Sequence, residues 1–460
     1  MSERRRVEVV NTAASGPRPA FATLPTRAMT DLHDTAPPTV VWAYRRTGKF
    51  AFHVLTGALA TDARSKHVPI EFANGVDATV AAITTALQRP GARVLVGWSF
   101  YSPDAAAMTQ ELQAVRARID DPRVLHVCGG VHASAEPEAT LRAGWDLVAI
   151  GEGERLIADL AHCLEHGGDP RTVPGIASLT ADGTLRKNGR AERIVLDDYP
   201  PFGPSHGRFG PIEITRGCIY ACRFCQTPYF AGASFRHRSV ENVRQWARFL
   251  VGRGFRDFRF LTPTSLSYGT HTQEPDLAAV EALLAAVREE IGPARKLWFG
   301  TFPSEVRPEH VTPASLALLK KWVSNKALIV GGQSGSDRVL ASSARGHDSA
   351  CIERAVALCV EHGFVPHVDF LLGLPGEEAS DVDATLQLMD RLVGRGAKVH
   401  GHTFLPLPGT PFRKSPAGAL TADVRRRLRN LASKGQLYGQ WEQQEVTARE
   451  MAATRPVRRS

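Results

Sequence analysis

The chain has 460 residues, of which 43% are hydrophobic and 22% are charged, and its net charge at neutral pH is +9. This composition is ordinary for a globular protein, and no apolar run approaches the roughly 20 residues that a membrane-spanning helix needs. The length exceeds one typical domain, so we expect two domains with extensions, located in the cytoplasm. The basic residues gather at 4–6, at 425–429 and at the C-terminal end, as in solvated tails. We therefore expect neither a membrane nor a nucleic acid as a partner.

The first 166 residues divide into two parts. Residues 1–38 are rich in Pro, Ala, Thr and Arg without a sustained period, which predicts a disordered N-terminal extension. From residue 39 to residue 166, short apolar runs alternate with amphipathic stretches. The runs are TVVWAYR (39–45), VPIEF (68–72), RVLVGWSF (93–100), RVLHVCGG (123–130) and DLVAIG (146–151). This alternation predicts an α/β domain with a doubly wound, flavodoxin-like parallel sheet.

Ligands bind at the carboxyl ends of the strands in sheets of this kind. In this chain, those ends carry Ser99, Gly129 and Gly130. The two glycines either let a bulky ligand approach the backbone or simply allow tight turns. Residues 167–205 are predicted to be a linker with a small hairpin, because GIASLTADGTLRKNG places a Gly-containing turn between two short strands.

The stretch at residues 212–230, IEITRGCIYACRFCQTPYF, contains Cys218, Cys222 and Cys225. This spacing can place three sulfur atoms around one corner of a cuboidal iron–sulfur cluster and leave the fourth iron without a protein ligand. The alternative is a closed zinc site with His237 as the fourth ligand. The remaining cysteines are scattered, as expected of reduced thiols; they are Cys128, Cys163, Cys351 and Cys359.

The motif C-x3-C-x-aromatic-C, with Phe224 as its aromatic residue, resembles the signature of the radical S-adenosylmethionine (radical SAM) superfamily. The resemblance implies a four-iron four-sulfur cluster whose open iron is chelated by the amino and carboxylate groups of SAM. It further implies an electron donor of the flavodoxin or ferredoxin type. Cleavage of SAM would then release a 5'-deoxyadenosyl radical that abstracts hydrogen from the substrate.

Six further strand-and-helix units are predicted in a core domain at residues 206–415. The strands are PIEIT (211–215), FRDFRFLTP (255–263), KLWFGTFP (296–303), KALIVGGQS (326–334), HVDFLLGLP (367–375) and KVHGHTFLPLP (398–408). Six units fall short of the eight in a complete barrel, so we expect an open (β/α)6 TIM-like barrel, similar to radical SAM cores, with functional residues at the C-terminal ends of its strands.

The same resemblance implies a set of contacts to SAM at these strand ends. They are Phe224, Thr262, Pro263, Ser304, Gln333, Ser334, Ser336, Arg345, Gly373 and Pro375. Ser334 and Ser336 fit helix capping or a turn equally well. Glu305 is a candidate contact to SAM or substrate, and His402 is a candidate substrate contact.

The segment GGVHAS…DLVAIGEGE lies directly upstream of this core, and residues 39–166 are similar to the cobalamin-binding domain of cobalamin-dependent radical SAM enzymes. The resemblance implies that the nucleotide tail of cobalamin runs past Ser99, Gly129 and Gly130. The Asp-x-His-x-x-Gly motif that supplies a cobalt ligand in some cobalamin proteins is missing after the first strand. Three possibilities stay open: cobalamin without a protein ligand, ligation by His53 or His132, or no cobalamin.

Residues 416–460 are predicted to be a helical extension, with one helix around residues 421–445. Tyr438 and Trp441 in this extension either cap the open barrel or serve packing alone.

The sequence as a whole predicts a radical SAM enzyme that uses cobalamin to methylate an unactivated carbon of a small-molecule or peptide substrate. One alternative is a radical SAM rearrangement without methyl transfer, and another is a corrinoid or cluster sensor. Methylthio transfer to tRNA is disfavoured, because it would want a second three-cysteine site upstream.

Overall fold

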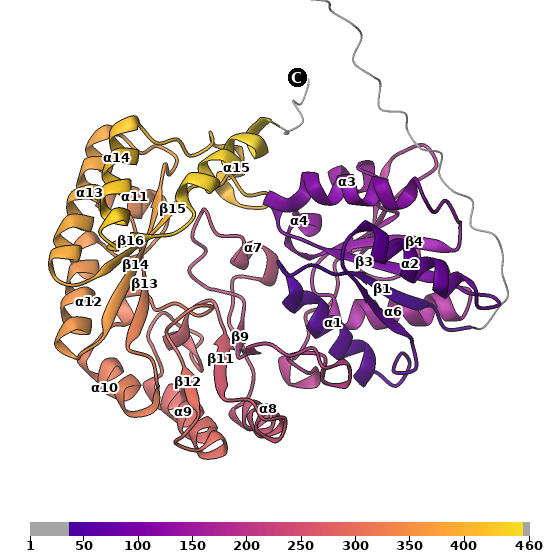
Figure 1. Ribbon diagram of the computed structural model, residues 1–460, viewed down its shortest axis with the longest axis horizontal. Coiled ribbons are helices and arrows are strands. Elements are labelled where there is room, and N and C mark those ends of the chain that lie inside the picture. Colours follow the sequence, from indigo (N-terminus) through magenta and orange to yellow (C-terminus); the bar gives the residue numbers. More distant parts are fainter. Residues whose placement is uncertain (1–35, 454–460) are drawn as a thin grey trace, which may run out of the picture.

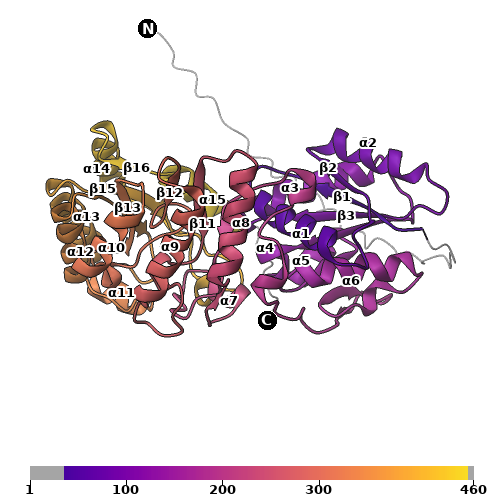
Figure 2. The same cartoon turned by 90° about the horizontal axis from the view of Figure 1, so that it is seen from below.

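The computed structural model describes residues 36–453, so the predicted extension at residues 1–38 falls almost entirely outside the described residues. The chain forms two α/β domains that lie side by side (Figures 1 and 2). Within residues 36–453, no helix combines the length and the apolar character that crossing a bilayer requires.

The first domain is built on a seven-stranded sheet with the order β2-β1-β3-β4-β5-β6-β7. Its parallel strands are β1 (Thr39–Ala43), β2 (Ile70–Ala73), β3 (Val94–Ser99), β4 (Val124–Gly129) and β5 (Leu147–Ala149). The order 2-1-3-4-5 is that of flavodoxin-like, doubly wound sheets. The predicted α/β class and parallel sheet are thus confirmed.

Helices cover both faces of this sheet, which is why all five residues of β1 are buried. Helices α1 (Lys49–Thr61) and α6 (Glu154–Glu165) pack on one face. The other face is covered by α2 (Val76–Leu87), α3 (Ala105–Arg116), α4 (Gly130–Ala135) and α5 (Pro137–Arg142).

The hairpin expected in the linker extends the first sheet. Strands β6 (Ile176–Leu179) and β7 (Leu185–Lys187) add to β5 in antiparallel fashion, with Ala177 opposite Val148. Ile176 is fully buried in the same core as α6. The sheet of the first domain therefore runs to residue 187, beyond the boundary expected at residue 166.

The second domain is a curved, open barrel of parallel strands with helices along its outer side (Figure 1). The strands are β8 (Ile212–Glu213), β11 (Asp257–Leu261), β12 (Lys296–Trp298), β13 (Ala327–Gln333), β14 (Val365–Leu372) and β15 (Lys398–Thr403). The outer helices include α8 (Val240–Gly252), α9 (Leu277–Ile291), α10 (Pro313–Trp322), α12 (Ser349–Glu361) and α13 (Ala379–Gly394). Val306, which bridges Val330, joins the two halves of the barrel sheet.

The C-terminal segment differs from the single helix expected around residues 421–445. It forms α14 (Ala422–Ser433), the strand β16 (Leu437–Tyr438) and α15 (Trp441–Ala453), with β16 pairing in parallel with β15. Gly435 (φ 69°) and Gly439 (φ 126°) adopt positive φ on either side of β16, so one helix does not continue through this segment. A Cβ atom on Gly439 would come within 2.2 Å of the Gly401 carbonyl oxygen, so only glycine allows this close approach.

Candidate active site

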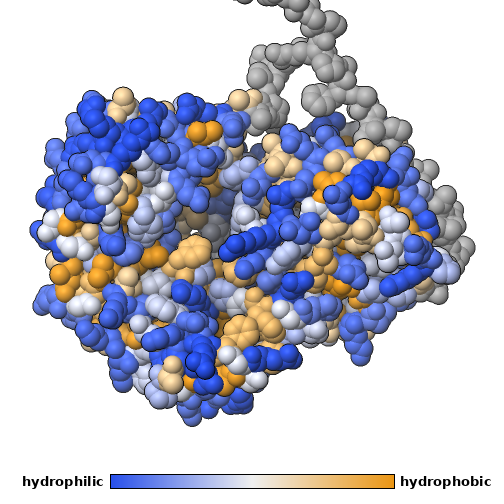
Figure 3. Space-filling model, viewed as in Figure 1, coloured by the Kyte–Doolittle hydropathy of each residue, from blue (hydrophilic) through white to orange (hydrophobic). Residues whose placement is uncertain are grey.

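A cavity of about 820 Å³ lies between the two domains, at the C-terminal ends of both sets of strands. Ser99, Gly129 and Gly130 line it from the first domain, and Phe224 and Cys225 line it from the second. Figure 3 shows the surface hollowed where the two halves of the molecule meet. The volume of the cavity lies in the upper part of the range of roughly 300–1,000 Å³ found for ligand pockets.

The cysteine loop runs from β9 (Thr215–Arg216) to the short helix α7 (Thr227–Ala231). Gly217 begins it with φ 84°, and a Cβ atom there would lie 2.1 Å from the Ser234 carbonyl oxygen. The Cys218 amide donates to the Gly232 carbonyl at 3.0 Å, and the Cys225 amide donates to the Cys222 carbonyl at 3.1 Å. The backbone therefore fixes the loop through its own hydrogen bonds.

The thiols are largely buried, so they must lose their protons when they bind a metal. Burial raises the pKa of Cys218 to about 11, and burial also raises the pKa of Cys225. Arg345, itself buried, places Nη1 3.4 Å from the Cys222 sulfur and donates from Nη2 to the Gly331 carbonyl at 2.6 Å. Because thiolates are the metal ligands, iron must displace these protons, and Arg345 offsets the negative charge that results.

The zinc alternative does not fit this geometry. The Thr215 hydroxyl oxygen lies 3.0 Å from Nδ1 of His237, and the Thr270 carbonyl lies 2.8 Å from its Nε2, so both ring nitrogens are engaged. In tetrahedral zinc sites with Zn–S bonds of about 2.3 Å, two sulfurs lie about 3.8 Å apart. Among the described residues, the cysteine triplet is not a group whose ligand atoms all lie within 4.8 Å of one another. The wider spacing suits a cluster of several irons.

Four of the predicted SAM contacts line the cavity: Phe224, Thr262, Pro263 and Gln333. Phe224 packs in a small apolar cluster with Phe404. The Thr262 hydroxyl donates to the Thr264 carbonyl at 3.1 Å, which holds the end of β11. Polar groups and an aromatic face thus meet the cavity next to the cysteine loop.

The other predicted SAM contacts do not line the cavity. The hydroxyl of Ser304 is hydrogen-bonded to that of Ser265, and the Ser334 hydroxyl lies 3.2 Å from Thr385 Oγ1. Ser336 caps α11 (Asp337–Ser342) and donates to Asp381, which is the capping role weighed above. Arg345, Gly373 and Pro375 are also outside the lining residues. The role of these residues in SAM binding stays a prediction.

At Gly129 and Gly130, the first-domain wall of the cavity offers backbone rather than side chains. Gly130 has φ 86°, and a Cβ atom there would meet the Ser99 hydroxyl oxygen at 2.8 Å. The two histidines considered as cobalt ligands do not line the cavity. Nε2 of His53 lies 3.0 Å from the Tyr44 hydroxyl, and Nδ1 of His132 lies 3.1 Å from the Ser102 hydroxyl. Burial lowers the pKa of each histidine to about 4, so both are neutral at physiological pH.

A buried ion-pair network joins the domains beside the cysteine loop, and sequence reasoning missed it. Nη2 of Arg216 lies 2.6 Å from both Glu154 Oε1 and Glu213 Oε2, and its Nη1 lies 3.3 Å from Glu152 Oε2. Arg236 also binds Glu152. Burial opposes ionisation of Glu152, but the hydrogen bond from Arg236 and the charge of Arg216 keep its pKa below the usual range.

Three further polar side chains line the barrel side of the cavity: Glu305, Asp369 and His402. The sequence singled out Glu305 and His402, but it gave no reason to select Asp369 or its neighbour His400, which lie inside regular strands. Burial, and then the charge of Asp369, raise the pKa of Glu305. The arrangement can hold a proton or a cation at the cavity wall.

The fold and the cysteine loop define the class of this protein: an α/β iron–sulfur protein with an open barrel next to a doubly wound domain. Residues 212–389 match the model of the radical SAM superfamily. The second domain is therefore a radical SAM domain. This class implies a four-iron four-sulfur cluster and SAM as cofactors.

Some known proteins resemble the chain in sequence, and others resemble it in fold. It is 28% identical over 351 residues to a tRNA-2-methylthio-N(6)-dimethylallyladenosine synthase of Halorhodospira halophila, covering 74% of this chain and 67% of that protein. The radical SAM methyltransferase TsrM of Kitasatospora setae, solved with cobalamin and a [4Fe-4S] cluster, has a similar fold (TM-score 0.63, 19% identity, 82% of this chain and 73% of TsrM). The cobalamin-dependent radical SAM enzyme OxsB, solved with aqua-cobalamin, is similar as well (TM-score 0.61, 15% identity, 77% of this chain and 52% of OxsB).

Proposed function

We propose that this protein is a cobalamin-dependent radical SAM enzyme that methylates an unactivated carbon of a small-molecule or peptide substrate. The observation that carries the proposal is the shared cavity, which Gly129 and Gly130 face from one domain and Phe224 and Cys225 face from the other. A reaction that brings two cofactors to one substrate needs a space of this kind. The cofactors supply the difficult chemistry, and the chain positions them.

The first-domain wall suits a large, flat ligand. Ser99, Gly129 and Gly130 would hold cobalamin, because the glycines leave the backbone itself as the contact surface. When bound there, cobalamin would supply the methyl group. Since His53 and His132 do not line the cavity, the arrangement favours cobalamin without a histidine ligand from this domain. The fold that the chain shares with TsrM and OxsB, both solved with cobalamin bound, supports cobalamin binding.

The barrel wall suits the cluster and SAM. Cys218, Cys222 and Cys225 would hold the cluster, which together with SAM supplies the radical that removes a hydrogen atom from the substrate. Thr262 and Gln333 present polar groups to the same space, and Phe224 adds an aromatic face. We expect a flavodoxin- or ferredoxin-type protein to deliver the electron, in the cytoplasm.

Methylthio transfer to tRNA is the second candidate, because the relative from Halorhodospira halophila carries that name. Such a reaction would want a second three-cysteine site. Here Cys128 lies on β4, Cys163 on α6, and Cys351 and Cys359 on α12, so the other thiols do not gather into a triplet. The thiol positions therefore favour methyl transfer over methylthio transfer.

The test is anaerobic purification after expression with cobalamin, followed by iron, sulfide and cobalt quantitation on one sample. We expect about four irons and about one cobalt per chain. Gly130→Val should lower the cobalt content and leave the iron content unchanged. Gly183→Val is the matched control, because Gly183 has a similar φ of 79° but no atom within 4 Å of a Cβ atom there.

The outcomes separate the candidates. Iron without cobalt would contradict methyl transfer and favour a rearrangement. Absence of 5'-deoxyadenosine under strong reduction would contradict an enzymatic function and favour a corrinoid or cluster sensor. Transfer of label from methyl-labelled SAM to tRNA, with sulfur, would favour the methylthio reaction.

A further inference from the structure

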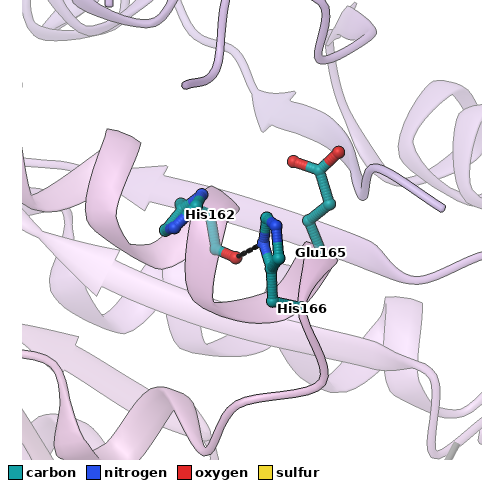
Figure 4. Close-up of side chains that lie close together, drawn as sticks. All are labelled: His162, Glu165 and His166. Carbon is teal, nitrogen blue, oxygen red and sulfur yellow. Dashed lines mark hydrogen bonds between the residues drawn. The ribbon is translucent and has the colours of Figure 1, made fainter. Parts of the chain in front are cut away.

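Among the described residues, two groups of three side chains bring potential metal-ligand atoms within 4.8 Å of one another. One comprises His162, Glu165 and His166 at the end of α6 (Figure 4). Nδ1 of His166 lies 2.9 Å from the His162 carbonyl, and Glu165 is already paired with His67 at 2.8 Å. These residues come from one partly exposed helix and have partners, so this group carries no proposal.

The other group comprises Asp369, His400 and His402 inside the barrel. Nδ1 of His400 lies 2.8 Å from Asp369 Oδ1 and 3.2 Å from His402 Nε2. His400 and His402 are two residues apart on β15 and therefore face the same side of the sheet. Asp369 sits directly opposite His400 on β14, and its side chain is only 5% exposed. Two neighbouring strands thus direct three ligand atoms to one point.

Hydrogen bonding alone does not satisfy this arrangement. An imidazole nitrogen has either one N–H or one in-plane lone pair. Nδ1 of His400 faces two partners at once, so a single proton satisfies at most one of them well. A cation among the three atoms would satisfy all of them. In tetrahedral zinc sites with ligand bonds of about 2.0–2.1 Å, ligand atoms lie about 3.3 Å apart, close to the spacing here.

Neighbouring side chains hold the two imidazoles in place. The Tyr438 ring stacks on His400 with centroids 4.4 Å apart and an angle of 10° between the planes. The side-chain amide of Gln444 lies 3.3 Å from Nδ1 of His402, and its Oε1 accepts from the Thr403 amide at 3.0 Å. The two contacts of Gln444 fix the orientation of the His402 ring. Such outer contacts set the orientation of metal-binding histidines.

We infer that Asp369, His400 and His402 form a second metal site, which binds a divalent cation of the zinc type at the cavity wall. Two histidines and one carboxylate are the donor set of zinc sites that keep a position open. Asp369 and His402 line the cavity, so the open position faces the substrate space. A cation there would bind an oxygen or nitrogen atom of the substrate and polarise it.

The experiment uses the full chain with its iron–sulfur cluster intact. The anaerobic protein is treated with a chelator, incubated with Zn²⁺, desalted and analysed for zinc and iron on one sample. We expect about one zinc per chain beside the irons. His402→Gln and Asp369→Asn should each lose the zinc and keep the iron. Gln444→Ala should weaken zinc binding about 10- to 100-fold, as expected for a positioning residue.

The exposed group on α6 provides the matched control. The double variant His162→Gln/His166→Gln should retain the zinc, and loss of zinc in it would overturn the inference. Zinc that persists in His402→Gln, or no zinc in the unaltered protein, would overturn it too. If a variant also loses its iron, Co²⁺ is bound to the unaltered protein in place of Zn²⁺ and its absorption spectrum is recorded. A spectrum without sulfur-to-cobalt charge transfer supports the inference. A spectrum with such charge transfer places the ion in the cysteine loop and refutes the inference.

Discussion

Arg216→Met tests the buried network that joins the two domains. The change leaves Glu154 and Glu213 without the cation that pairs with both, whereas Glu152 keeps Arg236. The side chains of Glu152 and Glu154 are each only 4% exposed, and that of Glu213 is 13% exposed. Breaking a buried ion pair by removing one partner costs about 3–5 kcal/mol. We therefore expect a loss of this size in the free energy that holds the interface closed.

Amide hydrogen exchange measures this loss directly. A cost of about 3–5 kcal/mol raises the open population by about two to nearly four orders of magnitude. Protection at residues 150–156 and 212–217 should fall by that factor, while the centres of both sheets stay protected. The unfolding midpoint should also shift downward.

The control is Arg155→Met, which removes the arginine that follows Glu154 on α6 of the first domain. Arg155 pairs with Glu192 at 2.6 Å, but the two side chains are 55% and 72% exposed. Exposed pairs contribute about 0–1 kcal/mol. The double variant Arg216→Met/Glu154→Gln should recover part of the loss, because it removes one unpaired charge. If Arg216→Met costs no more than Arg155→Met, the network does not hold the domains together.

Three further predictions concern the cluster loop and pH. Cys222→Ala should abolish iron binding and leave the circular dichroism spectrum unchanged; zinc in place of iron in the anaerobic protein, lost in this variant, would contradict the assignment to iron. Gly217→Ala should cost more than about 1–3 kcal/mol of strain at positive φ, because the new Cβ atom also meets Ser234; Gly183→Ala, with open space, is the comparison, and equal costs would refute the argument. The pKa of His53 is about 4 in the fold because of burial, against about 6.5 in the unfolded chain. Its stability contribution is therefore complete above pH 6.5 and is lost as pH falls toward 4, by roughly 2–3 kcal/mol. A pH slope that His53→Gln leaves unchanged would disprove this.

The sequence was most informative where the pattern is local. Apolar runs identified β1 to β5 of the first domain and the barrel strands β8 and β11 to β15, and the cysteine spacing located the loop at the ends of the barrel strands. The spacing of Cys218, Cys222 and Cys225 is a property of one short segment, so it survives without knowledge of the fold.

The sequence did not predict the long-range pairings, because these join residues that lie far apart in the chain. The hairpin at residues 176–187 was visible, but its pairing with β5 depends on a partner nearly 30 residues away. Arg216 precedes the cysteine loop and Glu154 opens α6, and no local pattern connects them. The same holds for Asp369 and His400, which meet only because β14 and β15 align in register.

The late position of β16 in the chain has a consequence for synthesis on the ribosome. The first sheet is complete once Lys187 has emerged, whereas β15 keeps an open edge until Leu437 and Tyr438 arrive. About 35 residues separate Thr403 from Tyr438, which corresponds to roughly 2–7 s at about 5–20 residues per second. During that interval the unpaired backbone of β15 is a template for other strands. The barrel is thus the part of this molecule whose yield depends most on the speed of translation and on chaperones.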